Sequence, residues 1–168
     1  MGIAGANRLA RGPVHLILFV SYKTGNSMSS SMTAVEIQSW LDSSPFIRFL
    51  QLQCTQADGE AGQLEMTMPM RTELERGAGG TQFHGGPVAS LIDTAGTFAI
   101  IMGARAPVPT INFRVDYLRP SGGSQLIAKA LVRRAGKTVG VVDVDVYDDQ
   151  SRLTAVGRGC FGVPAAQA

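Results

Sequence analysis

The chain has 168 residues, enough for one domain with a substantial core but few for two. Hydrophobic residues make up 45% of it and charged residues 17%, which indicates a globular protein. The formal net charge is only +2, and no Lys/Arg cluster alternates with aromatic residues. We therefore expect no nucleic-acid partner.

The first 31 residues differ from the rest of the chain. Arginines precede a short apolar run at 14–20, and a Ser-rich stretch follows it, an order that resembles a signal peptide. The run is far too short to span a membrane, and no convincing small-x-small cleavage site follows. We interpret the segment as a disordered extension, or as an over-extended reading frame that truly starts at Met28 or Met32. The predicted division is an extension, one domain and a tail: residues 1–31, 32–164 and 165–168.

Cysteine and histidine are scarce. Cys54 and Cys160 lie in apolar strand-like runs and match no metal spacing, so we expect buried free thiols in a reducing compartment and a cytoplasmic location. Because His15 and His84 are the only histidines, we expect no metal site.

The first predicted element is a short amphipathic helix that begins after Thr33, where "TAVE" has the capping-box pattern, and ends before Pro45. The side expected to face the core is apolar: Val35, Ile37, Trp40 and Leu41. Alternating apolar residues at 50–54 and 64–70 then predict two strands, and "ADGEAG" between them has the residues of a hairpin turn.

A glycine-rich segment leads into a long apolar helix, predicted from Gly86 to Met102. Four closely spaced strand-like runs follow the helix: 110–118, 125–134, 138–148 and 152–162. Their short separators predict antiparallel neighbours, because parallel pairing needs a crossover of a dozen or more residues. We therefore predict an α+β domain in which an antiparallel sheet of about six strands wraps around one long central helix.

That helix holds a single carboxylate, Asp93, the only formally charged side chain between Gly77 and Ala104. Its predicted core stripe lies elsewhere on the helical wheel: Val88, Leu91, Ile92, Ala95, Phe98 and Ala99. The residues one turn from the aspartate are all small: Ala89, Ser90, Gly96 and Thr97. A solvated helix face normally carries charges of both signs, whereas small residues suit close approach by a ligand or another backbone. We therefore interpret the aspartate as a candidate base or nucleophile.

The amino end of the same helix is predicted to bind an anion. Gly85 and Gly86 place N–H groups at its positive end, where a developing oxyanion would be stabilised. Eight residues separate Gly85 from Asp93, which is about 12 Å along a helix axis. One chain cannot bring both groups to one carbonyl, but two antiparallel helices in a two-fold dimer can. The spacing therefore predicts a homo-oligomer with a composite site.

Three stretches, "HGGPVASLIDTAG", "INFRVDYLRP" and "VGRG", resemble the hotdog-fold acyl-CoA thioesterases of the phenylacetate-pathway and 4-hydroxybenzoyl-CoA type. The resemblance covers 34–163. It implies a dimer or a dimer of dimers, and no cofactor or metal other than the coenzyme A of the substrate. By position, it implies that the Gly85 N–H polarises the thioester carbonyl, that Asp93 activates water or attacks directly, and that Thr110 helps to position the water.

The resemblance also concerns the substrate. His84 is expected to order the loop through a hydrogen bond and, with Gly86, to lie at the substrate. Many family members carry an asparagine six residues before the histidine, and this chain has Ala78 there. Gln82 is the nearest amide that would substitute for it. Losing one oxyanion donor lowers a rate by roughly 10²–10³. Three alternatives therefore stay open: Gly85 suffices, the loop supplies another N–H, or hydrolysis is slow.

For the coenzyme A phosphates, "VRRAGKT" offers Arg133, Arg134 and Lys137 at a turn, and Arg119 is a second candidate. We therefore predict an acyl-CoA thioesterase for a small aromatic or a short- to medium-chain acyl group, with no membrane partner. A non-hydrolytic acyl-CoA-binding protein of the same fold is the alternative. A dehydratase is disfavoured because no Asp–His pair has suitable spacing.

Overall fold

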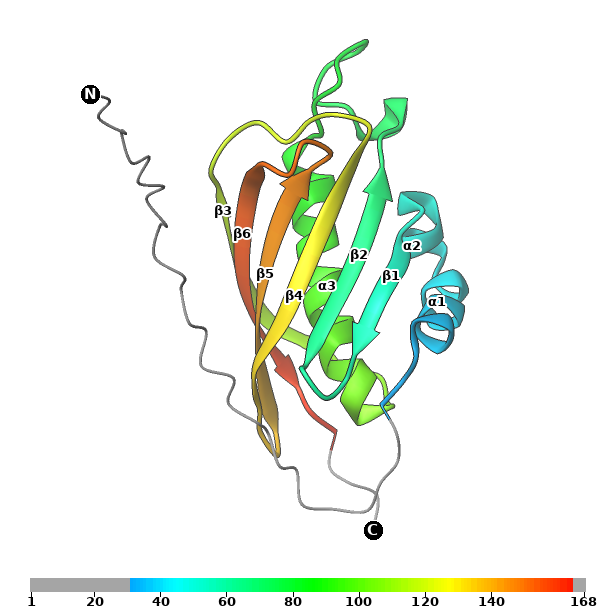
Figure 1. The fold of residues 1–168 in the computed structure, drawn as a ribbon, viewed down its shortest axis with the longest axis vertical. Helices are drawn as coiled ribbons and strands as arrows, with labels where there is room; N and C mark the ends of the chain where they lie inside the picture. The colour runs from blue at the N-terminus through cyan, green and yellow to red at the C-terminus, as the bar shows by residue number, and fades with distance from the viewer. Residues whose placement is uncertain (1–30, 165–168) are drawn as a thin grey trace, which may run out of the picture.

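The computed structural model describes residues 31–164, which form one sheet and its helices (Figure 1). In chain order the elements are α1 (Ala34–Ser43), α2 (Pro45–Leu50), β1 (Gln53–Asp58), β2 (Gln63–Pro69), the 3-10 turn η1 (Thr72–Leu74), α3 (Gly85–Ala104), β3 (Thr110–Tyr117), β4 (Gln125–Ala135), β5 (Val139–Asp148) and β6 (Leu153–Gly162). The prediction of a six-stranded antiparallel sheet around one long helix is confirmed. The predicted extension and tail lie, apart from Ser31, outside the described residues.

The strands lie in the order β1-β2-β4-β5-β6-β3, and every neighbouring pair is antiparallel. The short separators correctly predicted the β4–β5 and β5–β6 pairs. Between β3 and β4 the same argument was wrong, because β3 pairs with β6 at the edge of the sheet. The short connection therefore crosses the ends of β6 and β5 to reach β4 (Figure 1).

Helix α3 lies across one face of the sheet and forms the centre of the core (Figure 1). All six residues of its predicted core stripe are buried. Gly96, predicted to flank Asp93, instead faces the sheet, since a Cβ there would lie 2.6 Å from the Phe161 ring. By length and composition α3 is apolar enough to span a membrane, but 61% of its apolar stretch is buried in the domain. It is therefore the core helix of this fold.

The chain before β1 differs from the prediction in two respects. Val35 was expected to face the core but is 80% exposed, because residues two apart on a helix point in nearly opposite directions and Ile37 is buried. The second helix, α2, was not predicted. Ser44 caps it and Pro45 occupies its first turn, so Leu50 ends a helix instead of starting a strand.

The predicted capping box is present at the start of α1. The Thr33 N–H donates to the Glu36 carboxylate at 2.8 Å, and the Glu36 N–H donates to the Thr33 hydroxyl at 3.3 Å. The same carboxylate accepts a hydrogen bond from Arg105, just after α3, at 2.7 Å. The Thr33 N–H, followed by Arg105, lowers the pKa of Glu36 from 4.5 to about 2. One carboxylate therefore joins the two helices.

This contact predicts an acid-dependent stability. Because the pKa of Glu36 is lower in the folded chain than in the unfolded one, its contribution is complete above about pH 4.5 and is lost as the pH falls toward 2. Urea unfolding of Glu36→Gln should show a weaker loss of stability across that window than the unsubstituted chain. Glu60→Gln, in the β1–β2 turn, is the matched control. Equal pH dependence in all three proteins would contradict the assignment.

Candidate active site

The amino end of α3 is capped by a histidine ring. His84 is the N-cap residue, and its Nδ1 accepts a hydrogen bond from the Gly86 N–H at 3.1 Å. A neutral ring that accepts at Nδ1 carries its proton on Nε2, which leaves that N–H as a donor. The histidine side chain forms a hydrogen bond, as expected, but with the first turn of α3 and not with the loop before it. The prediction of two free glycine N–H groups was half wrong, since the ring uses that of Gly86.

Gly85 supplies the remaining backbone donor. Within residues 31–164 its N–H has no hydrogen-bond acceptor, as befits the first turn of a helix. The chain on either side is held in place. The His84 N–H donates to the Leu74 carbonyl at 2.8 Å, and the Tyr117 hydroxyl donates to the Gly85 carbonyl at 2.8 Å. The free N–H therefore lies between two anchored groups.

The loop before the helix is tied to the β3–β4 connection. The Phe83 N–H donates to the Ser121 carbonyl at 2.8 Å, and the Gly123 N–H donates to the Thr81 carbonyl at 3.0 Å. Gln82, between them, is exposed, and its backbone forms an isolated bridge to Gly122. Ala78 is exposed further along the loop. The loop thus offers no side-chain amide at the position where the resembling family has one.

Asp93 lies half-buried on the side of α3 that approaches β3. The Thr110 hydroxyl donates to its Oδ1 at 2.9 Å, and the Thr97 hydroxyl lies 3.3 Å from that of Thr110. A hydroxyl has one proton, so Thr97 is the donor in this second contact. Among the described residues Asp93 forms no ion pair. The carboxylate is held by the Thr110 hydroxyl, with no cation beside it in the described part of the chain.

Two of these contacts connect the two ends of β3 to two different points on α3. Thr110 is the first residue of β3 and bonds to Asp93, whereas Tyr117 is the last and bonds to Gly85. The unbroken helix separates the carboxylate from the free amide by eight residues, or about 12 Å. Each end of one strand therefore carries one of the two candidate reactive groups.

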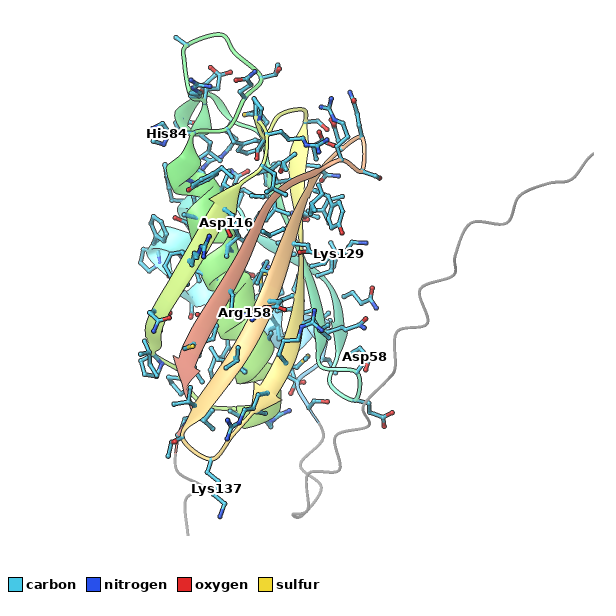
Figure 2. The ribbon with its side chains drawn as sticks, turned by 90° about the vertical axis from the view of Figure 1, so that its left-hand side faces the viewer. Asp58, His84, Asp116, Lys129, Lys137 and Arg158 are labelled. Atoms are coloured by element: carbon cyan, nitrogen blue, oxygen red, sulfur yellow. The ribbon has the colours of Figure 1, made fainter. Side chains whose placement is uncertain are left out.

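The basic residues predicted for phosphate binding fall into two groups. Arg119 is exposed just after Tyr117, at the Gly85 end of the strand. Arg134 and Lys137 are exposed at the β4–β5 turn, and Figure 2 shows Lys137 at the opposite end of the molecule from His84. Within one chain the two groups do not meet.

Arg133, the third residue of that turn, lies on the outer face of the sheet, away from α3. Its Nε donates to Asp143 at 2.7 Å, and Arg158 binds the same carboxylate. These arginines, Arg158 foremost, lower the pKa of Asp143. A groove of about 710 Å³ follows this face, and its lining acids and bases, apart from Asp145, form ion pairs with one another. The candidate reactive groups lie instead at α3.

Two contacts of the site were not predicted from the sequence. The sequence analysis predicted no role for Tyr117, which lies in "INFRVDYLRP". It treated Thr97 only as a small neighbour of Asp93. The spacing of four residues between Asp93 and Thr97 was the available signal, since such pairs share a helix face. Within residues 31–164 no group of three His, Cys, Asp or Glu side chains is arranged to hold a metal ion.

Comparisons with known proteins agree with this geometry. A family model described as the thioesterase superfamily matches residues 82–155, which include α3 and β3. A protein of Halobacterium salinarum, classed only provisionally as an esterase, is 38% identical over 77% of this chain and 91% of its own length. The acyl-coenzyme A thioesterase PaaI of Escherichia coli is 39% identical over 45% of this chain and 54% of its own length. A solved structure from the thioesterase superfamily superposes with a TM-score of 0.73 at 30% identity, covering 78% of this chain and 98% of that one.

Proposed function

Since the chain belongs to the thioesterase superfamily, we propose that it hydrolyses an acyl-CoA thioester in a site shared by two subunits. Gly85 of one subunit binds the thioester carbonyl oxygen, and Asp93 of the other supplies the base or nucleophile. The name of the Escherichia coli relative, an acyl-coenzyme A thioesterase, supports coenzyme A as the carrier. The acyl group we propose is a small aromatic or a short- to medium-chain one, and the location cytoplasmic.

The observation that carries this proposal is the pair of hydrogen bonds at the two ends of β3. Within the described residues β6 is the only sheet neighbour of β3. One face of the strand is apolar yet uncovered within one chain, with Ile111 55% exposed and Tyr117 55% exposed. A long exposed edge strand of this kind favours pairing with another strand. A second copy of β3, related by a two-fold axis, is the partner we propose.

Such a pair has a direct consequence for the chemistry. When a strand pairs antiparallel with its own copy, its first residue lies opposite the last residue of the copy. Thr110, with Asp93, then approaches Tyr117 of the other subunit, with that subunit's Gly85. Gly85 and Asp93 are about 12 Å apart within one chain. In the pair, Gly85 of one chain lies close to Asp93 of the other. Two equivalent sites result.

The reaction needs one donor and one carboxylate. The Gly85 N–H stabilises the oxyanion that develops on the thioester carbonyl. Asp93 removes a proton from water as the water oxygen bonds to the carbonyl carbon, and the proton passes to the sulfur when the C–S bond breaks. Direct attack by the carboxylate would instead break the C–S bond, release the coenzyme A thiolate and form a mixed anhydride that water then cleaves. Thr110, already bonded to Asp93, orients the carboxylate in either course.

The remaining contacts with substrate follow from the same arrangement. The exposed Nε2 of His84 offers a donor in the loop that lacks a side-chain amide at Ala78. Gln82 and Gly86 line the same end of α3. For the phosphates we propose Arg119 from one subunit, with Arg134 and Lys137 from the other.

We predict that hydrolysis requires both reactive groups, so that loss of either one abolishes most of the activity. Asp93→Asn removes the carboxylate. Gly85→Pro removes the N–H and adds a pyrrolidine ring, which the backbone accepts because His84 already has φ −64 and ψ 150, values that suit a residue before proline. Each variant should lose roughly 10²–10³ in kcat for thiol release from acyl-CoA. Gly85→Ala is the control that keeps the N–H, since its Cβ would meet Tyr117 at an ordinary 3.4 Å.

The assay tests the roles of the carboxylate and the amide in variants that assemble as the unsubstituted protein does. Full activity in a folded Asp93→Asn protein would exclude the carboxylate. Full activity in Gly85→Pro would exclude the amide donor.

The absence of a side-chain donor at Ala78 favours one second candidate, a protein that binds acyl-CoA without hydrolysing it. Titration calorimetry with a non-hydrolysable thioether analogue, run beside the thiol-release assay, separates the two. We expect release with a panel of acyl-CoA thioesters. Tight binding of the analogue with no release from any thioester would favour the binding protein.

A further inference from the structure

We propose that Tyr117 is a positioning residue that fixes the direction of the Gly85 N–H, an inference that rests on the proposed thioesterase function. Its hydroxyl donates to the Gly85 carbonyl at 2.8 Å. Its ring lies beside the same residue, 3.4 Å from the place where a Cβ would stand. Tyr117 thus holds a backbone group that has no side chain of its own.

The need for such a restraint follows from the local sequence. Two successive glycines begin α3, and glycine populates a wider range of backbone conformations than any other residue. An oxyanion donor works only when it lies about 2.7–3.1 Å from the oxygen, in a fixed direction. The His84 N–H, bonded to Leu74, fixes the chain before the donor. Tyr117 fixes the chain after it.

The hydrogen bond of Tyr117 also connects to the histidine cap. The peptide group between Gly85 and Gly86 accepts from the tyrosine through its oxygen, and donates to His84 Nδ1 through its nitrogen. Hydrogen bonds at the two ends of one amide polarise it and strengthen each other. The peptide between Gly85 and Gly86 is therefore held by hydrogen bonds at both its oxygen and its nitrogen. It directly follows the peptide that carries the free Gly85 N–H, so it also restrains the direction of that N–H.

Packing within one subunit does not explain the tyrosine, which is 55% exposed there on the edge strand. A phenyl ring at this position would keep the contact with Gly85 and lose only the hydroxyl. Because Ala78 provides no side-chain amide, Gly85 is the one backbone donor that we propose for the oxyanion, so its orientation should control the rate.

The test compares Tyr117→Phe with the unsubstituted full-length protein in steady-state thiol release. We expect kcat to fall about 3–10-fold, which corresponds to one hydrogen bond, while KM changes less than about two-fold. The reason is that the carbonyl gains most of its negative charge in the transition state, so the donor acts there. Tyr147→Phe, which removes a hydroxyl from the outer face of the sheet, is the matched control and should keep its kcat.

Each outcome is informative. An unchanged kcat in Tyr117→Phe, or a rise in KM with constant kcat, would overturn the positioning role and make the tyrosine a binding or interface residue. A similar fall in Tyr147→Phe would show a general effect of lost hydroxyls and also overturn it. Absence of thiol release from the unsubstituted protein would instead refute the proposed function itself.

Discussion

The site depends on one constraint, the fixed distance along α3 between an amide and a carboxylate. Gly85 and Asp93 lie on one unbroken helix, eight residues apart, and no loop movement can shorten about 12 Å of helix. The Asp93 carboxylate and the Gly85 carbonyl are hydrogen-bonded to opposite ends of β3. Whatever covers the free edge of this strand therefore decides which groups meet. A second copy of the strand, the partner we propose, would run in the opposite direction and bring the Gly85 amide and the Asp93 carboxylate together twice.

Carboxylates on the two faces of the sheet have different partners. On the outer face Asp143 is paired with Arg133 and Arg158. Asp93, on α3, has a hydroxyl partner and no ion pair among the described residues. A carboxylate neutralised by arginine is a weak base and a weak nucleophile. The absence of an arginine partner therefore suits Asp93 to the role that we propose for it.

The sequence was sufficient for the elements whose pattern is long and regular. Hydrophobic periodicity located α3 and the last four strands within two residues of their observed bounds, because each has a continuous apolar face, which is buried in all of them except β3. It did not predict that β3 lies at the sheet edge, since a short connection limits distance and not strand order. Helix α2 was missed because six residues hold too little periodicity, although Ser44 and Pro45 are capping signals.

For the candidate site, the sequence singled out two groups on one helix but not their partners. Asp93 and Gly85 were recognisable from isolation of charge and from the glycine pair. The contact of Tyr117 with Gly85 joins residues 32 positions apart, and such a contact depends on how β3 docks beside α3. The position of Arg133 in a turn motif likewise did not predict its hydrogen bond to Asp143.

The most direct test of the shared site is complementation between two inactive variants. Asp93→Asn and Gly85→Pro proteins, unfolded together and refolded as a mixture, would form heterodimers in about half of all pairs. Each heterodimer would hold one site with an intact amide and an intact carboxylate, so the mixture should recover about one quarter of the unsubstituted activity. If both groups of a site came from the same subunit, every site would stay defective, and a mixture with no recovered activity would contradict the account.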